Sequence, residues 1–574
     1  MDLKELRENI VGLNTLFETP YGERIMTYAD YTASGRSLKF IEKYMLEIQK
    51  IYANSHTDDD CTGKTMTGLL HKSEEIIKKE LNASKNCMII ATGNGSTGAI
   101  AKFSEILGIY MPPATKVKLE QLVEDFLEIE ETSEYRDAFD QLNDKWLKSR
   151  PVIFIGPYEH HSNILIWRES IAEVVEIKLG SDGYLDMDDL KYNLHREEFK
   201  NRIKIGSFSA ASNVTGIKTE VYEISRILHE NGALACFDFA ASGPYVEINM
   251  NLNEASYFDA VFISPHKFIG GPGTTGLLVM NEKHYNNTLP PTVAAGGTVN
   301  YVNRFSQDYN EVPEEREKAG TPGILQMVKA ALVFELKGRI GVDRIEEIEE
   351  IYTRQFFERF KNNKNIEILG PLDAQKRISI VSFMIKNNGK YLHPRFVTKL
   401  LNDLFGIQSR AGCACAGPYG HRLLSIDDET AKIMRSFLKE GMRSLKLGWT
   451  RVNFHYVMSQ EEVTFILDAI EFIAAYGYLF LNEYEVNLQS GEWRHINEID
   501  LNYWVTDFGI DRCLKLQESF EPNQPVDRSK LYQKYLIDSH NMAANILTNI
   551  ERLPFRTMNA KYEAQRWFDF ANEF

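Results

Sequence analysis

The chain has 574 residues, of which 43% are hydrophobic, 25% are charged and 18 are proline, a composition that is typical of folded globular proteins and excludes a largely disordered chain. One ordinary hydrophobic core does not extend over this length, so two or three domains are expected. The net charge of −16 disfavours nonspecific attraction to nucleic acid or to anionic membranes, so neither is expected as a partner.

The N-terminal stretch MDLKELRENIVGLNTLFETP alternates charged and apolar residues, which predicts a helical segment at 1–24, and it lacks the apolar core of a signal peptide. No later run approaches the ~18 apolar residues of a membrane span. The six cysteines are widely separated apart from Cys413 and Cys415, which indicates reduced thiols instead of a disulfide framework. These features predict a cytoplasmic protein.

From about residue 85 to 280, short apolar runs rich in Val, Ile and Phe alternate with helical patterns. The runs are CMIIAT, PVIFIG, AEVVEIKL, IKIGSFSA, ALACFDFA, FDAVFIS and TGLLVM. Runs that are buried on both faces and separated by helices are typical of a mostly parallel sheet with helices on both sides. The sequence therefore predicts a large α/β domain over 25–322.

Three further regions differ from this pattern. Residues 111–150 are acidic and helical in pattern, and they separate two of the apolar runs, which predicts an inserted helical arm. Helical stretches around the run RISIVSFMI predict a smaller α+β domain over 323–477, which carries a cysteine loop. Residues 478–574 contain several aromatic residues and form a C-terminal extension to which the sequence assigns no chemistry.

Polar residues and glycines gather where the predicted strands end, in GNGSTG, PYEHHSN, SNVTG, DFAASG and PHKFIGGPG. Ligands of open α/β sheets bind at the carboxyl ends of the strands. We therefore expect these loops to share one site.

Gly93, Gly95 and Gly98 form a G-x-G-x-x-G motif after a strand and at the start of a helix, which superficially satisfies the dinucleotide fingerprint. That fingerprint also requires an acidic residue about 20 residues further on, where this chain has the helical insertion instead. An anion site is better supported, because free N–H groups, the hydroxyls of Ser96 and Thr97 and the helix dipole all favour phosphate. An ordinary capped helix is the alternative.

Lys267 follows an apolar strand and precedes a glycine-rich turn in FDAVFISPHKFIGGPGTTG. Most lysines lie on the surface, but one beside a desolvated site can have a lowered pKa and form a Schiff base. Asp238 ends a strand so apolar that an unpaired carboxylate there is costly, and a protonated pyridine nitrogen is a suitable partner. A Schiff-base lysine and an aspartate on a pyridinium form the protein signature of pyridoxal 5'-phosphate (PLP) enzymes.

The order of these motifs, through EHHSN, SNVTG, the strand aspartate, SPHK, AGTP and RAGCACAGP to TRVNF, resembles the class V aminotransferase-like enzymes of PLP fold type I. Within them the chain is most similar to the cysteine desulfurase and selenocysteine lyase branch. The resemblance extends over roughly residues 25–475, and it depends on the order and spacing of the motifs together. It implies an α/β fold with a mostly parallel sheet and helices on both faces, plus a smaller α+β domain.

The resemblance also implies roles for individual residues. It makes Lys267 the lysine that binds PLP covalently and Asp238 the partner of the pyridine nitrogen. His160 matches the imidazole that stacks on the ring and moves protons, with His161 as the second choice. The remaining cofactor-binding positions match Asn213 near the phenolic oxygen and Ser96, Thr97, Ser264 and His266 near the phosphate.

The loop Gly296–Val299, which includes Thr298, resembles the loop that dimers of this family lend to the phosphate of the neighbouring subunit, so a homodimer is expected. Arg451 matches the arginine that binds the substrate carboxylate, a task that suits its bidentate fork. In the cysteine loop, the family pattern R-x-G-x-x-C-x-x-P begins at Arg410, which is also expected at the substrate, and its catalytic thiol falls on Cys415.

Two departures from the family pattern limit this assignment. The desulfurases usually have glutamine, or in relatives histidine, three residues after the strand aspartate, and this chain has Ala241. That side chain normally bonds the phenolic oxygen of the cofactor, so Ala241 leaves the reaction less defined. Cys413 stands where desulfurases tend to have histidine, and with the arm and the extension it indicates a distinct subgroup.

The resemblance implies a PLP-dependent carbon–sulfur lyase, in its simplest form an L-cysteine desulfurase that yields L-alanine and a Cys415 persulfide for a protein sulfur acceptor. One alternative is an aminotransferase, epimerase or other β-lyase in which Cys415 is not catalytic. Another is a non-catalytic CxC metal or redox module, which is disfavoured because a closed zinc site needs about four ligands. No second Cys or His pair lies close in sequence, and no metal site is predicted.

Overall fold

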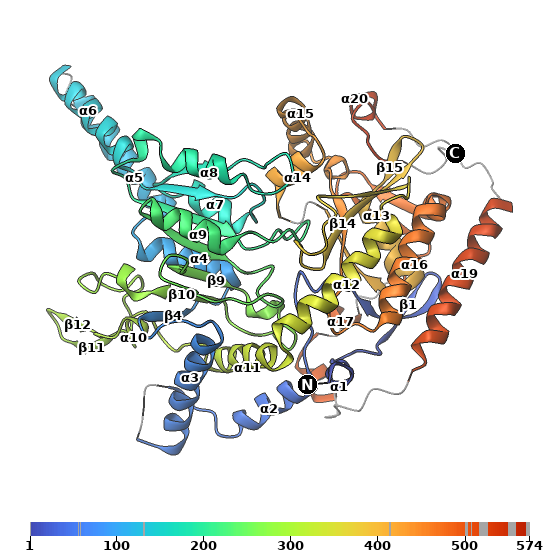
Figure 1. The fold of residues 1–574 in the computed structure, drawn as a ribbon, viewed down its shortest axis with the longest axis horizontal. Helices are drawn as coiled ribbons and strands as arrows, with labels where there is room; N and C mark the ends of the chain where they lie inside the picture. The colour runs from blue at the N-terminus through green and yellow to red at the C-terminus, as the bar shows by residue number, and fades with distance from the viewer. Residues whose placement is uncertain are drawn as a thin grey trace.

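The computed structural model describes residues 2–55, 57, 59–129, 133–412, 415–499, 503–506, 508–515, 526–548 and 558–569. Within these residues, two main sheets lie on opposite sides of the molecule, with the long helix α11 (Ile324–Ile340) passing below the first of them (Figure 1).

The larger sheet has seven strands in the order β4-β10-β9-β8-β7-β5-β6. All neighbouring pairs are parallel except those of β10, which runs antiparallel to β4 and to β9. Each of the seven predicted apolar runs forms one of these strands, so the predicted mostly parallel sheet is confirmed. The strands are β4 (Cys87–Ala91), β5 (Val152–Ile155), β6 (Glu173–Glu176), β7 (Lys204–Ser209), β8 (Ala233–Asp238), β9 (Ala260–Ile263) and β10 (Leu277–Asn281).

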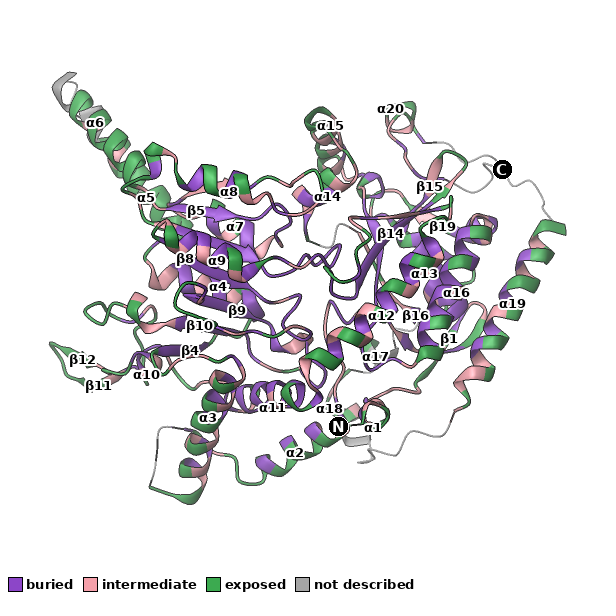
Figure 2. Ribbon diagram, in the orientation of Figure 1, coloured by how far each residue is buried: buried purple, intermediate pink, exposed green. Residues whose placement is uncertain are grey.

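Helices cover both faces of this sheet because successive strand residues point to opposite sides. In β4, Met88 and Ile90 pack into one apolar cluster, whereas Ile89 packs into the other. The first cluster includes residues of α4 (Gly95–Ile106) and α7 (Ser162–Arg168), and the second includes residues of α3 (Cys61–Glu80), α9 (Val221–Glu230) and α11. Figure 2 shows the buried strands between these partly exposed helices.

The second sheet has the order β13-β14-β18-β17, with β15 also paired to β14, and all its pairs are antiparallel. It lies within the region that was predicted to form the smaller α+β domain. Its strands are β13 (Ile366–Ile368), β14 (Ile380–Asn387), β15 (Lys390–Leu392), β17 (Arg410–Gly412) and β18 (Trp449–Asn453), and its helices include α12 (Val342–Phe360), α13 (Pro394–Phe405) and α16 (Gln460–Tyr476).

The predicted helical segment at 1–24 is wrong beyond Glu8. Helix α1 covers Leu3–Glu8, and a hairpin of β1 (Leu16–Thr19) and β2 (Gly22–Ile25) follows it. Tertiary contacts decide between helix and hairpin here, because this alternation of charged and apolar residues suits both the helical period and the strand period. The hairpin contacts the end of α13 in this way. Gly406 ends that helix with φ 72°, and a Cβ there would lie 2.3 Å from the Ile25 carbonyl oxygen.

The predicted insertion forms two helices, α5 (Pro113–Ile129) and α6 (Ser133–Ser149), which project from the body (Figure 1). Nearly all of their described side chains are exposed (Figure 2). The arm therefore adds little to the core of the larger sheet.

The C-terminal helix α19 (Arg528–Thr548) lies against α16 and near β1 (Figure 1). The stretch Gln460–Glu483 is long and apolar enough to cross a membrane, since an 18-residue window within it has a mean hydropathy of 1.6, but 67% of that window is buried inside the protein. Since α13 and α19 pack against it, we interpret α16 as a core helix.

Candidate active site

A cavity of about 270 Å³ opens where β4, β5, β7, β8 and β9 end, and strands β17 and β18 of the second sheet close its far side. In the described part of the chain it brings together eleven of the twelve predicted site residues, and only Thr298 lies elsewhere. The eleven are Ser96, Thr97, His160, Asn213, Asp238, Ser264, His266, Lys267, Arg410, Cys415 and Arg451.

One end of the cavity is formed by the N-terminus of α4, which suits an anion. The Ser96 N–H donates to the Ser264 hydroxyl oxygen at 2.8 Å, and the hydroxyls of Thr97 and Ser162 lie 2.7 Å apart. Gly95 has φ 62°, and a Cβ there would lie only 2.7 Å from the Ser264 hydroxyl oxygen. Glycine therefore allows this hydroxyl to approach the helix N-terminus, and the hydroxyls and N–H groups together match the needs of a phosphate.

Lys267 and Asp238 lie on the sheet side of the cavity. Asp238 is the last residue of β8 and is 3% exposed, and its Oδ1 accepts the Ala240 N–H at 2.9 Å. Burial raises the pKa of Asp238, while the Ala240 N–H and the charge of Lys267 oppose this shift. Burial also lowers the pKa of Lys267 to about 8, and the Asp238 carboxylate opposes that change. The pair therefore offers an amine that loses its proton more readily than that of an exposed lysine, beside a buried carboxylate.

His160 faces the same cavity with a defined orientation. Its Nδ1 accepts the Ser162 N–H at 3.2 Å and lies 3.1 Å from the Ser162 hydroxyl. Burial, followed by the charge of Lys267, lowers the pKa of His160 to about 4. The neutral ring that accepts at Nδ1 carries its proton on Nε2.

His161, the second choice for this role, lies outside the cavity lining among the described residues. Its Nε2 accepts the Gly417 N–H at 2.9 Å, and its own N–H donates to the Cys415 carbonyl oxygen at 2.8 Å. The structure therefore does not support His161 as the ring-stacking imidazole, because the local turn directs its side chain to the cysteine loop.

Two acidic residues near the site were missed by sequence reasoning. Glu159 is 2% exposed and accepts hydrogen bonds from N–H groups of Gly156, Asn163 and Ser209, so it links the loop after β5 to the end of β7. Burial raises its pKa to about 7. Its position in PYEHHSN was the available signal, since a carboxylate at the end of a buried strand needs partners.

Asp30, the second missed residue, joins the two predicted substrate arginines. Its Oδ1 lies 3.0 Å from Arg451 Nη2, and its Oδ2 lies 2.9 Å from Arg410 Nε. The arginines are direct partners across β17 and β18, and Arg451 Nη1 also donates to the Asn213 carbonyl oxygen at 2.9 Å. Asp30 thus aligns two guanidinium groups on one wall of the cavity.

Cys415 lies on an exposed loop between β17 and α14 (Gly417–Leu423), and it lines the cavity. Cys413 lies outside the described residues. Ala241 is buried and also lines the cavity, where it presents only a methyl group. Both positions that the sequence analysis singled out therefore line this cavity.

Thr298 is fully buried outside this cavity, and its hydroxyl donates to the Ala295 carbonyl oxygen at 2.7 Å. Its role at the phosphate of a neighbouring subunit stays a prediction.

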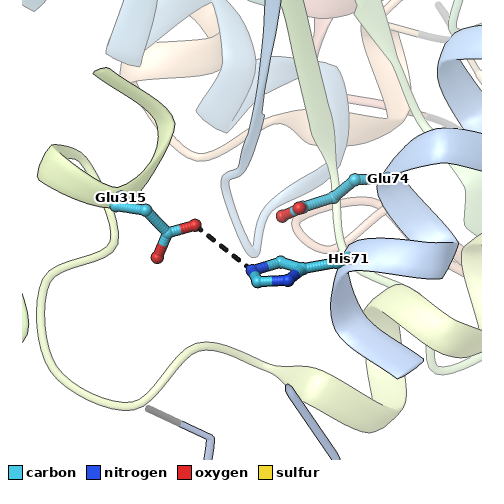
Figure 3. A group of neighbouring side chains, drawn as sticks. All are labelled: His71, Glu74 and Glu315. Atoms are coloured by element: carbon cyan, nitrogen blue, oxygen red, sulfur yellow. Dashed lines mark ion pairs between the residues drawn. The ribbon is translucent and has the colours of Figure 1, made fainter. Parts of the chain in front are cut away.

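A separate group of ionisable side chains, His71, Glu74 and Glu315, lies between α3 and the segment before α11 (Figure 3). The Lys318 ammonium lies 2.8 Å from Glu74 Oε1 and 2.6 Å from Glu315 Oε1. Because this cation already forms ion pairs with both carboxylates, we interpret the group as an ion-pair network and not as a metal centre.

The family model described as "Aminotransferase class-V" matches residues 132–466. Two curated relatives, each named "Probable cysteine desulfurase", are 29% identical to this chain. The relative from Halalkalibacterium halodurans matches 53% of this chain and 71% of its own length, and the relative from Pyrococcus abyssi matches 61% and 81%.

Solved structures of cysteine desulfurases share the fold. That of Thermococcus onnurineus NA1 has a TM-score of 0.60 at 24% identity and covers 78% of this chain and 95% of its own. That of Escherichia coli CsdA has a TM-score of 0.59 at 16% identity and covers 82% and 98%. These similarities confirm the predicted fold class, PLP fold type I with a mostly parallel sheet.

Proposed function

The chain belongs to the class-V aminotransferase family, and from this premise we propose that it is a PLP-dependent L-cysteine desulfurase. One observation carries the proposal: Lys267, Asp238 and a phosphate-suited helix N-terminus share a cavity with an exposed thiol, Cys415. The names of the relatives support the same reaction.

The residues of the cavity fit PLP. The amine of Lys267 is suited to bind the aldehyde, and the Asp238 carboxylate is suited to pair with the pyridine nitrogen. The donors around α4 that suit the phosphate are Ser96, Thr97, Ser264 and His266. PLP, when bound, supplies an electron sink that weakens the bonds at the α- and β-carbons of an amino acid.

The other side chains of the cavity bind the substrate and move its protons. Arg451 and Arg410 attract the substrate carboxylate, and Asp30 keeps their two guanidinium groups aligned. The Lys267 amine, whose pKa is about 8, takes up the α-proton at Nζ in its neutral form. His160 holds a proton at Nε2 and can donate it within the cavity.

Cys415 accepts the sulfur. Its thiolate attacks the substrate sulfur, so a sulfur–sulfur bond forms as the carbon–sulfur bond breaks. The electron pair of that bond remains on the β-carbon, which takes up a proton, and L-alanine leaves while Cys415 keeps a persulfide. Because Cys415 is exposed, a protein sulfur acceptor can reach the persulfide.

Two substitutions test this assignment in the PLP-loaded protein. Cys415→Ala should reduce sulfide and alanine production from L-cysteine to below about a thousandth of the wild-type rate, since it removes the nucleophile. The visible absorbance of bound PLP should remain. Lys267→Ala should remove that absorbance together with activity.

The exposed free cysteine at the start of α3 provides a matched control, because Cys61→Ala changes an accessible thiol outside the cavity and should leave activity unchanged. Full desulfurase activity in Cys415→Ala would refute the proposed role of this thiol.

Ala241 favours one second candidate, another class V reaction such as transamination, epimerisation or β-elimination. A methyl group cannot bond the phenolic oxygen of the cofactor, so the electron sink of this site is tuned differently from that of the desulfurases. Separate measurement of alanine, pyruvate and amino-group transfer from L-cysteine and other amino acids distinguishes these reactions.

The functional unit we propose is a homodimer. The hairpin of β11 (Val299–Val302) and β12 (Gln307–Tyr309) projects from the body beside α10 (Pro313–Arg316) (Figure 1). Its tip exposes Phe305 to 87% and Val302 to 59%, which is typical of a surface covered by a partner. Thr298 lies at the base of this hairpin. Light scattering in solution measures the number of subunits and so tests the homodimer.

A further inference from the structure

Cys415 has a backbone conformation that residues other than glycine rarely adopt. Its φ is 56°, in the left-handed region, although it lies on an exposed loop. A conformation of this kind persists only where the surrounding contacts hold it.

His161 supplies two contacts that hold this loop. Its N–H donates to the Cys415 carbonyl oxygen at 2.8 Å, and its ring Nε2 accepts the Gly417 N–H at 2.9 Å. The two hydrogen bonds therefore restrain the backbone at the Cys415 carbonyl and at the Gly417 N–H, on both sides of Ala416.

The contact between the His161 ring and Gly417 suits a neutral imidazole. A Cβ at Gly417 would lie 3.3 Å from Nε2, so glycine allows the ring to approach the backbone closely. A nitrogen that accepts a hydrogen bond is unprotonated, so the ring carries its proton on Nδ1. Burial, with the charges of Lys446 and Arg168, lowers the pKa of His161 and favours this neutral form.

We propose that His161 is a positioning residue that holds the loop of Cys415 so that its thiol faces the cavity. It acts through the loop and not on the substrate, because among the described residues His160 lines the cavity and His161 does not. Two consecutive histidines thus have different tasks, with ring centroids 6.3 Å apart. The sulfur-transfer part of this inference rests on the proposed function, whereas the loop contact does not.

Hydrogen–deuterium exchange on the PLP-loaded protein tests the contact without any sulfur chemistry. In His161→Ala, amide hydrogens between Cys415 and Gly420 should exchange about tenfold faster, because both restraints are weakened and one acceptor is lost. In His161→Gln they should exchange nearly as in the wild type, since an amide oxygen can accept the Gly417 N–H.

The matched control is His421→Ala, which removes an exposed imidazole of α14 and should leave exchange in this loop unchanged. Unchanged exchange in His161→Ala would overturn the proposal. It would also be overturned if the acceleration extended equally to the strands of the larger sheet, because that result indicates general destabilisation.

Rapid measurement of persulfide formation tests the consequence for the thiol. His161→Ala should slow persulfide formation on Cys415 about 10- to 100-fold, as expected for a displaced reacting group. The KM for L-cysteine and the absorbance of bound PLP should not change, and His161→Gln should recover most of the rate.

An unchanged rate in His161→Ala, or a loss of rate accompanied by loss of PLP absorbance, would refute the positioning role. If the wild type itself forms no persulfide, the proposed function fails, and the exchange result still decides whether His161 holds the loop.

Discussion

Lys267 shows how one buried pair sets the reactivity of a side chain. Burial disfavours the charged amine and lowers its pKa to about 8, and the nearby Asp238 carboxylate keeps the pKa from falling further. The amine is therefore neutral in a useful fraction near neutral pH, which an exposed lysine with a pKa of about 10.4 is not.

This shift predicts a pH dependence for covalent PLP binding by the apo protein. Only the neutral amine reacts, so the rate should rise about tenfold per pH unit below the pKa of Lys267 and level off above about pH 8. Stopped-flow absorbance between about pH 6 and pH 10 measures this profile.

Asp238→Asn should move the midpoint of that profile below pH 8, because the carboxylate raises the pKa of Lys267. A wild-type midpoint near that of an exposed lysine would contradict the burial of this amine.

At the scale of elements, the start of α4 depends on a close contact between helix and strand end. A Cβ at Gly98 would lie 2.6 Å from the Thr92 carbonyl oxygen. With any larger residue at this position, α4 could not begin where it does. The phosphate-suited N–H groups of Ser96 and Thr97 belong to this first turn. The position of the anion site thus follows from the packing of one glycine.

Gly98→Ala should therefore weaken PLP binding. Overpacking of this kind costs about 1–3 kcal/mol, and the displaced helix start should lower the affinity about tenfold. Equilibrium titration with PLP measures the change.

Gly68→Ala is the control for a glycine in a helix, because a Cβ at this position of α3 meets nothing within 4 Å and Gly68 does not line the cavity. It should leave PLP affinity unchanged and stabilise the protein by up to about 1 kcal/mol. Equal PLP affinity in the Gly98→Ala protein and the wild type would show that the helix start tolerates displacement.

At the scale of the whole molecule, the C-terminal helix α19 joins segments from both ends of the chain. Tyr532 stacks on Phe465 of α16 with ring centroids 3.9 Å apart, and its hydroxyl lies 3.2 Å from that of Thr27. Tyr535 accepts the Ile25 N–H at 3.1 Å. The extension therefore packs against the N-terminal hairpin and the smaller sheet's core helix.

Tyr532→Ala should destabilise the protein by about 3–5 kcal/mol, because it leaves a cavity beside Phe465 and removes a buried ring. Ile537→Ala, at an exposed position of the same helix, should change stability by less than about 0.5 kcal/mol. Urea unfolding of both proteins measures the difference, and equal stabilities would show that α19 contributes little to the fold.

The seven strands of the larger sheet and the positions of Lys267 and Asp238 were predictable because their signals are local, whereas Cys415 was assigned only through the resemblance to the family. Continuous apolar runs specify buried strands, and the residues that follow them lie at the same edge of a parallel sheet. The N-terminal hairpin was not predictable, since its alternation suits a helix or a strand and distant partners such as Gly406 decide between them.

The sequence by itself determined the chemistry of the site, because the residue types and their order along the chain specify an amine, a carboxylate, an anion-binding turn and a thiol. Only the tertiary structure decided how these groups are held. Asp30 meets Arg410 across 380 positions of sequence, and His161 turns away from the cavity to the loop of Cys415. Contacts at such separations depend on how the two sheets pack together, which the pattern of a single segment does not encode.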